Sequence, residues 1–288
     1  MIWQLFMGGY LVLGAGAYLI RRQLAVTFTE HSRIINGFFF IAVLYPLGLI
    51  IAAFSSPNLS IGWPNLILLL VGSAIFPIIN LLAYRASKDI DAGFYTILQN
   101  LTPIITIIAA SFLLHEGLNN HQLLGTVIIL VSAFLATLPN LKKHYKNSFA
   151  GLMIALSAVI LLGLAIVYER WMLTRMDFGA YLVYGWGAQT LWMAILAWPK
   201  RTQLKILKDK KTFLQVATYS AANALKGICI VAALTLSGNA SIVGASTGFM
   251  AALVVFAAYF ILKEKELLWF KISAVVVGIV GIIILNIT

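Results

Sequence analysis

The sequence predicts an all-α membrane protein in which ten transmembrane helices form two inverted five-helix repeats. Three observations lead to this fold class: the composition, the length of the apolar runs and an internal match between the two halves. Hydrophobic residues make up 61% of the 288 residues and charged residues 10%, whereas soluble proteins carry about 25% charged residues. So few charges cannot cover a water-facing surface, and lipid must therefore surround most of this chain.

Apolar runs of about 20 residues are long enough to cross the hydrocarbon core of a bilayer as helices. The runs in this chain are continuously apolar rather than alternating, which favours helices over the strands of a β-barrel. Charged or polar residues such as Arg21 and Arg22 separate most of them. The ten predicted spans are 2–20, 34–54, 64–84, 92–114, 122–139, 148–168, 178–199, 212–236, 239–262 and 267–287.

Lysine and arginine are distributed unevenly between alternate loops. The loops after the odd-numbered spans hold 17 of the 20 basic residues when Lys271, at the start of the tenth span, is counted with its loop, and those after the even-numbered spans hold only Arg170 and Arg175. Because cytoplasmic loops collect Lys and Arg, the odd-numbered loops are predicted in the cytoplasm and both termini outside. This distribution explains the net charge of +11 without a nucleic-acid partner, and the basic loop 200–211 is expected to contact anionic lipid headgroups.

The chain resembles itself at an offset of 148 residues. Residues 109–116 match residues 257–264, and each stretch closes the fourth span of its half with a glutamate. Five spans per half is an odd number, so the second half must lie in the membrane in the opposite orientation to the first. The sequence therefore predicts one five-helix repeat over 1–140 and a second over 141–288. Folds of this kind bind substrate near the midplane, between the halves.

Residues 92–137, with Pro103, Glu116 and Gly125, resemble the EamA-type transporters of the drug/metabolite transporter superfamily, and residues 240–285 carry a second copy of the pattern. The resemblance implies a ten-helix carrier of small metabolites in a prokaryotic inner membrane, often an exporter of amino acids or related compounds. We expect no cofactor, and we expect a monomer whose partners are its small-molecule substrate and the membrane lipids.

Lys226 is the one basic residue deep inside a predicted span, since Lys271 lies only four residues from the start of the last span. It lies 14 residues into the span 212–236, and a lysine at the centre of a bilayer costs about 2.5–3.5 kcal/mol. Gln215, Tyr219, Asn223 and Lys226 recur at helical spacing, so they form one polar stripe that must face protein or a water-filled cavity. We interpret Lys226 as the anchor of an anionic substrate group such as a carboxylate. The alternatives are a lysine paired with helix C-terminal carbonyls and a neutral lysine that is hydrogen-bonded structurally.

Other polar and aromatic residues at membrane depth are further candidates for a binding cavity. Pro103 removes a backbone N–H and can open its span locally, beside Gln99 and Asn100, although Asn100 could instead bond between helices. Aromatic residues in an apolar span more often serve packing, and Tyr10 and Tyr45 rank lowest. The remaining candidates are Asn80 and Tyr84 in span 3, and Trp186, Gln189 and Trp192 in span 7.

Small residues form a ridge along span 9. Ala240, Gly244 and Gly248 lie four residues apart, a spacing that lets another helix approach closely. We expect tight packing there, and we expect a gating motion in which spans 3–4 and 8–9 tilt against the remaining helices.

By these span boundaries, all nine acidic residues and all four histidines fall in loops or at span ends. Proton-coupled carriers keep a titratable group within the membrane, so a proton antiport that uses a carboxylate is disfavoured. Asp91 and Glu169 lie nearest the edges. Cys229 is the single cysteine, which excludes disulfides within the chain and cysteine-based metal sites.

The predicted function is transport by alternating access, and its expected direction is export of a carboxylate-bearing solute such as an amino acid. One alternative is import of a cationic, choline-like solute by an aromatic cage of Trp186, Trp192 and Tyr219. A second is an intramembrane lipid-handling enzyme. Such an enzyme needs an acid, histidine or metal constellation at depth, and the sequence offers none, so no enzyme is expected.

Overall fold

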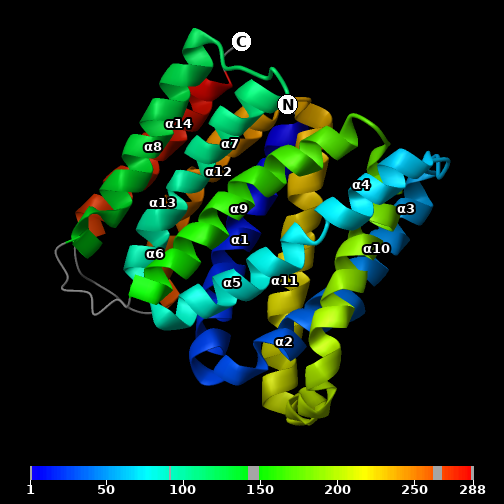
Figure 1. Ribbon diagram of the computed structural model, residues 1–288. Helices are drawn as coiled ribbons and strands as arrows, with labels where there is room; N and C mark the ends of the chain where they lie inside the picture. Colours follow the sequence, from blue (N-terminus) through cyan, green and yellow to red (C-terminus); the bar gives the residue numbers. More distant parts are fainter. Residues whose placement is uncertain (1, 91, 142–148, 262–267, 287–288) are drawn as a thin grey trace.

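The computed structural model describes residues 2–90, 92–141, 149–261 and 268–286, and these residues form helices without any strand (Figure 1). The all-α prediction is therefore confirmed for the described residues. The α-helices are α1 (Ile2–Thr27), α2 (Ser32–Phe38), α3 (Tyr45–Ser55), α4 (Trp63–Gly72), α5 (Ile75–Asp89), α6 (Ala92–Gln99), α7 (Leu101–Leu113), α8 (Asn120–Leu141), α9 (Phe149–Leu173), α10 (Phe178–Ala197), α11 (Lys210–Ser237), α12 (Ala240–Thr247), α13 (Phe249–Ile261) and α14 (Leu268–Leu285). Two 3-10 helices, η1 (Thr29–His31) and η3 (Trp198–Lys208), and a π-helix, η2 (Phe39–Leu44), complete the described elements.

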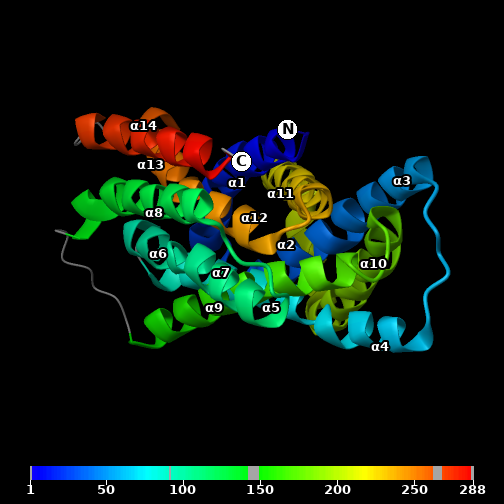
Figure 2. The same cartoon turned by 90° about the horizontal axis from the view of Figure 1, so that it is seen from above.

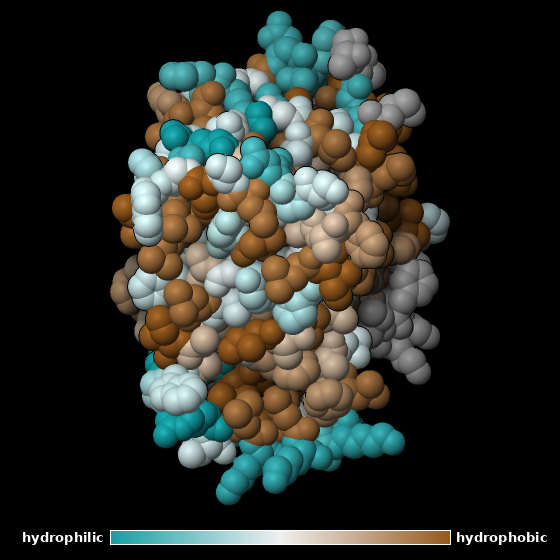
Figure 3. All heavy atoms as spheres, turned by 90° about the vertical axis from the view of Figure 1, so that its right-hand side faces the viewer, coloured by the Kyte–Doolittle hydropathy of each residue, from teal (hydrophilic) through white to brown (hydrophobic). Residues whose placement is uncertain are grey.

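Five helical segments are long and apolar enough to cross a membrane: Ile2–Thr27, Ser32–Ser55, Trp63–Asp89, Phe149–Leu173 and Lys210–Ser237. Further apolar helices are shorter, so the number of ten crossings stays a prediction. Large apolar side chains are strongly exposed, including Phe54 at 87% and Phe112 at 78%. Figure 3 shows hydrophobic residues over the middle of one face and hydrophilic residues gathered at its two ends. Such a surface suits the hydrocarbon core of a bilayer.

The two ends of the chain lie at the same end of the molecule. The side-chain amide of Gln4 donates a hydrogen bond of 2.9 Å to Asn286 Oδ1, and we call this side the terminal end. The basic helix η3 directly precedes α11, whose 28 residues extend about 42 Å. The N-terminus of α11 thus marks the opposite end of the molecule, the η3 end (Figure 1).

Several predictions fall outside the described residues. They concern the basic loops around 142–148 and 262–267, the near-edge Asp91, and Glu264, the glutamate of the second matched stretch.

Two helices of the bundle are interrupted at a single residue. Asn100 separates α6 from α7, and Gly248 separates α12 from α13. At both breaks the backbone N–H bonds three residues back, from Asn100 to Ile97 O and from Gly248 to Ala245 O, each at 3.1 Å. The first break agrees with the local opening predicted from Pro103, which has no N–H to donate to the preceding turn.

The two interrupted helices pack directly against each other. A methyl group on Gly244 of α12 would overlap the side chain of Thr106 on α7, and one on Gly248 would lie 3.4 Å from Pro103 Cγ. Thr106 Oγ1 in turn donates to Gly163 O of α9 at 3.3 Å. The small residues of span 9 therefore permit the close helix approach that the sequence predicts.

Gly244→Ala tests this contact. The added methyl group must displace the stiff, β-branched Thr106, and we expect a loss of about 1–3 kcal/mol in the free energy of unfolding. This loss is measured by titrating the purified protein in mixed micelles with a denaturing detergent until it unfolds. Gly16→Ala is the matched control, because a methyl group there meets no atom within 4 Å. Equal stability of the two variants would contradict the close approach.

Candidate functional site

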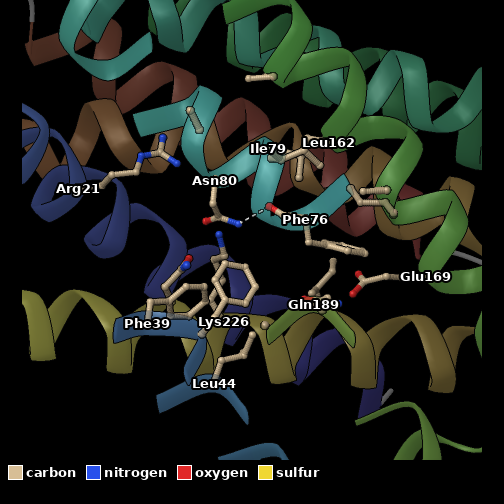
Figure 4. Close-up of a pocket in the computed structure, with 18 of the residues that line it drawn as sticks. Arg21, Phe39, Leu44, Phe76, Ile79, Asn80, Leu162, Glu169, Gln189 and Lys226 are labelled. Atoms are coloured by element: carbon tan, nitrogen blue, oxygen red, sulfur yellow. Dashed lines mark hydrogen bonds between the residues drawn. The ribbon is translucent and has the colours of Figure 1, made fainter. Parts of the chain in front are cut away.

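Two adjoining cavities lie between the helices. Side chains from α1, α6, α9 and α11 line both, and the first cavity extends further between α5, α10 and η2 (Figure 4). Apolar and aromatic residues such as Phe39, Phe76 and Ile166 form much of the wall of the first cavity. This mixture of apolar walls and a few polar groups is typical of small-molecule sites. The residues common to both cavities are Tyr10, Arg21, Gln99, Leu162, Asn223 and Lys226.

Most of the residues predicted for a binding site lie around these cavities. Lys226, Asn223 and Gln99 line both of them. Asn80, Trp186 and Gln189 line the first, and Asn100 and Tyr219 line the second. Tyr219, Asn223 and Lys226 of the polar stripe on α11 therefore face the interior of the bundle rather than lipid, as their spacing predicts, whereas Gln215 lines neither cavity.

Tyr84 does not reach either cavity. Its hydroxyl donates to Leu24 O at 2.7 Å and to Phe28 O at 3.2 Å, and the side chain is buried against the last turns of α1. On α5 the residues that line the cavity include Asn80 and Ala83. One residue beyond Ala83 the helix has turned by about 100°, which directs Tyr84 to the neighbouring helix.

The three aromatic residues of the alternative cage do not surround one space. The indole of Trp192 donates to Leu70 O at 2.6 Å and does not line either cavity. Trp186 lines the first cavity and Tyr219 the second. A choline-like solute held between these three rings is therefore not supported by the geometry.

Lys226 extends its ammonium group into the space between the helices (Figure 4). Its Nζ lies 5.7 Å from the centroid of the Tyr10 ring, within the range of a cation–π interaction. Among the described residues, Lys226 forms no hydrogen bond and no ion pair. The structural alternative, in which helix C-terminal carbonyls satisfy this lysine, finds no support in the described part of the chain.

Arg21 is a cavity residue that the sequence reasoning placed in a loop. Helix α1 continues to Thr27, seven residues beyond the predicted end of span 1, and carries Arg21 into both cavities. The guanidinium carbon lies 5.3 Å from the centroid of the Tyr18 ring and 5.9 Å from that of Tyr95. Within the described residues, its Nε and Nη2 atoms are buried and lack a hydrogen-bond partner. Arg21 follows Tyr10 by eleven residues and Tyr18 by three, a helical spacing that would have predicted the three side chains on one face of α1.

Glu169 corrects the prediction that every acid lies in a loop or at a span end. Helix α9 runs five residues past the predicted end at 168, and Glu169 is 6% exposed and lines the first cavity. Its Oε1 accepts a hydrogen bond of 3.1 Å from Tyr181 Oη. Leu162, Ile166 and Glu169 follow one another at helical spacing on the cavity side of α9. The apolar pattern of that face continues past Tyr168, so the helix does not end at its first charged residue.

Comparison with known proteins identifies the family of the first half of the chain. Residues 2–138 match the model of the EamA-like transporter family. These residues belong to the EamA-like transporter family. The match confirms the resemblance predicted from the sequence for residues 2–138, and this family is part of the drug/metabolite transporter superfamily, whose EamA members are transporters rather than enzymes. With its apolar helices, this EamA-like protein is an integral membrane protein.

A solved structure described only as a crystal structure of a protein is similar to the whole EamA-like chain. The TM-score is 0.67 at 14% sequence identity, and the alignment covers 96% of this chain and 98% of that one. At this identity the likeness shows a shared fold alone. No curated protein matches the chain.

A cluster centred on Glu116 closes the terminal end of the EamA-like fold. Arg170 Nε at the end of α9 donates to Glu116 Oε1 at 2.9 Å, and its Nη2 donates to Gly238 O at 2.7 Å. The other carboxylate oxygen of Glu116 accepts from the backbone N–H of Ala240 at 2.6 Å. Ser241 donates its hydroxyl to Glu116 O. The glutamate of the sequence pattern thus joins the end of α7 to α9 and to the N-terminus of α12, where a negative charge is favourable.

Arg170→Ala tests the Glu116 cluster. Both charged side chains are largely buried, with 16% and 15% exposure, so removal of the arginine leaves a carboxylate without its charge partner. We expect a loss of about 3 kcal/mol in the free energy of unfolding, measured in mixed micelles. Arg175→Ala is the control, because Arg175 is exposed and stacks on Trp171 at 4.2 Å, a contact that contributes about 0.5–1 kcal/mol. A loss no greater than that of the control would show that the Glu116 cluster contributes little to the free energy of unfolding.

Proposed function

We propose that this EamA-like protein transports a small solute that carries a carboxylate group, and that Lys226 and Arg21 bind that group. One observation carries the proposal: both basic side chains line the space shared by the two cavities, and among the described residues neither forms an ion pair. An anion between them would satisfy the unpartnered donors of Arg21 and screen the repulsion between the two positive charges.

The chemistry of the surrounding side chains supports a carboxylate. The planar guanidinium of Arg21 can donate two parallel hydrogen bonds to a carboxylate, and the ammonium of Lys226 adds a point charge with three donors. The amides of Gln99 and Asn223 line the same space and offer further donors. The aromatic wall around Trp186 suits the carbon skeleton of the solute.

We further propose that the chain consists of two inverted repeats, residues 1–140 and 141–288, which expose the cavity alternately to the two sides of the membrane. The breaks at Asn100 and Gly248 support this proposal, because they are 148 residues apart, which is the offset of the internal match. The matched family range ends at residue 138, close to the proposed boundary. An even number of crossings also accounts for the position of both chain ends at the terminal end.

The direction and gating of transport belong to the same proposal. The basic η3 end would face the cytoplasm of a prokaryotic cell, the terminal end would face outward, and the protein would act as an exporter from the inner membrane. Tilting of the interrupted helices about the Gly244–Thr106 contact would open the cavity, and release of the Glu116 cluster would accompany opening to the outside.

Lys226→Gln tests the anchor. Loss of one charge-assisted hydrogen bond costs about 1.5–3 kcal/mol of binding free energy, so the affinity for carboxylates should fall by about tenfold or more. The measurement is the thermal stabilisation of the purified protein by a panel of small carboxylates, amines and neutral solutes, followed by counterflow of the strongest hits in liposomes.

Lys210→Gln serves as the matched control, since Lys210 is exposed at the start of α11. It should leave the affinity for carboxylates unchanged. If no carboxylate stabilises the wild-type protein, or if Lys226→Gln binds carboxylates as tightly as the control does, the proposed anchor is wrong.

A further inference from the structure

Glu169 is a charged residue in the first cavity that carboxylate binding leaves without a role. We infer that Glu169 forms a second subsite of the same cavity, which binds the ammonium or another cationic group of the solute. The solute is then a zwitterion that lies with its carboxylate toward Lys226 and Arg21 and its cationic group toward Glu169. This inference rests on the proposed function, since it assumes that Lys226 and Arg21 bind the carboxylate.

Charges of opposite sign lie toward different ends of the cavity. Arg21 lies near the η3 end of α1, whereas Glu169 precedes Arg170, whose guanidinium bonds to Gly238 at the terminal end. Figure 4 shows Arg21 and Glu169 on opposite sides of the cavity, with Lys226 and Asn80 between them. A molecule bound along this direction therefore meets positive charge at one end and negative charge at the other.

The carboxylate of Glu169 has few partners from the protein itself. Among the described residues it receives a hydrogen bond only from Tyr181 Oη, at 3.1 Å, and it takes part in no ion pair. An ionised carboxylate offers about four acceptor positions, so most of the capacity of Glu169 remains free. A buried charge without a partner is unfavourable. A cationic solute group, with several N–H donors, would supply the missing partner.

The surroundings of Glu169 hold its carboxylate in one orientation. Tyr181 is fully buried and donates to Glu169 Oε1, and Gln189 Nε2 lies 3.5 Å from the same tyrosine oxygen. Gln189 itself lines the cavity. Tyr181 therefore acts as a positioning residue, whereas Glu169 is the residue that would contact the solute. A carboxylate fixed in this way loses little conformational freedom when a ligand binds.

Apolar side chains line the cavity together with the charged residues. Phe76, Ile166 and Trp186 line the same cavity as both Glu169 and Lys226. These side chains cannot satisfy either charged group, so they suit the carbon skeleton that joins the two groups of the solute. The length of this skeleton is open, and zwitterions of different length therefore belong in the test.

The experiment compares matched sets of probes at pH 7. One set contains leucine, 4-methylpentanoate and 3-methylbutylamine, and the other contains 6-aminohexanoate, hexanoate and pentylamine. Within each set, one probe carries both charges and the others lack the ammonium or the carboxylate. Binding to the wild-type protein, to Glu169→Gln and to Lys226→Gln is measured by titration calorimetry of the detergent-purified proteins.

For at least one set, we expect the zwitterion to bind the wild-type protein about tenfold more tightly than the acid or the amine. Glu169→Gln should remove the advantage of the zwitterion over the acid without weakening the binding of the acid. Tyr181→Phe, which removes the orienting hydrogen bond, should reduce the same advantage in part. Glu30→Gln is the matched control, because Glu30 is exposed and lies outside the cavity.

The outcomes separate this inference from the proposed function. If the acids bind, Lys226→Gln weakens them, and the ammonium adds nothing, the Glu169 subsite is wrong and the carboxylate anchor stands. The subsite is equally wrong if Glu169→Gln retains the full preference for the zwitterion. If the amines bind through Glu169 and no probe depends on Lys226, the proposed function fails and Glu169 forms a cation site alone. Should Glu169→Gln not fold, Tyr181→Phe decides the question by the same comparison.

Discussion

The high free energy of a charge in a low-dielectric environment is the constraint on which the rest of this structure depends. Phe54, Phe112 and many other apolar side chains face outward, so each charged group must lie at an end of the bundle, pair with another charge or line a cavity. Arg170 and Glu116 follow the second course at the terminal end. Lys226, Arg21 and Glu169 follow the third, and together they define where a polar solute can bind.

A second constraint is that backbone groups within a membrane must find partners inside the protein. At the interruptions the backbone N–H groups of Asn100 and Gly248 bond three residues back, and both residues line the second cavity. Their tight packing through Gly244 and Thr106 holds the breaks in place. Irregular backbone is thus tolerated here because it lies within the bundle rather than against lipid. The same contact joins a helix of the first half to one of the second.

The limits of sequence reasoning appear most clearly at the helix ends. A span was ended at its first charged residue, on the ground that lipid excludes charge, and this placed Arg21 and Glu169 outside the membrane interior. The rule holds for side chains that face lipid, whereas both residues project between helices. The prediction that Tyr84 lines the cavity was wrong for a smaller reason. One residue further along α5, the side chain points away from the cavity and its hydroxyl bonds to Leu24 O. Helical spacing gives the relative directions of residues, but it does not say what each face meets.

By itself, the sequence determined the helical class, the location of the apolar segments, the EamA resemblance and the polar stripe that ends at Lys226, because these depend on composition and on periodicity within one segment. Only the tertiary structure decided which helix faces lie together around the cavity. It brought Lys226 of α11, Arg21 of α1 and Glu169 of α9 to one cavity, and it kept Trp192 and Tyr84 away from it. Contacts between helices depend on how far each extends and how it is rotated against its neighbours, and the packing of side chains such as Gly244 against Thr106 sets both.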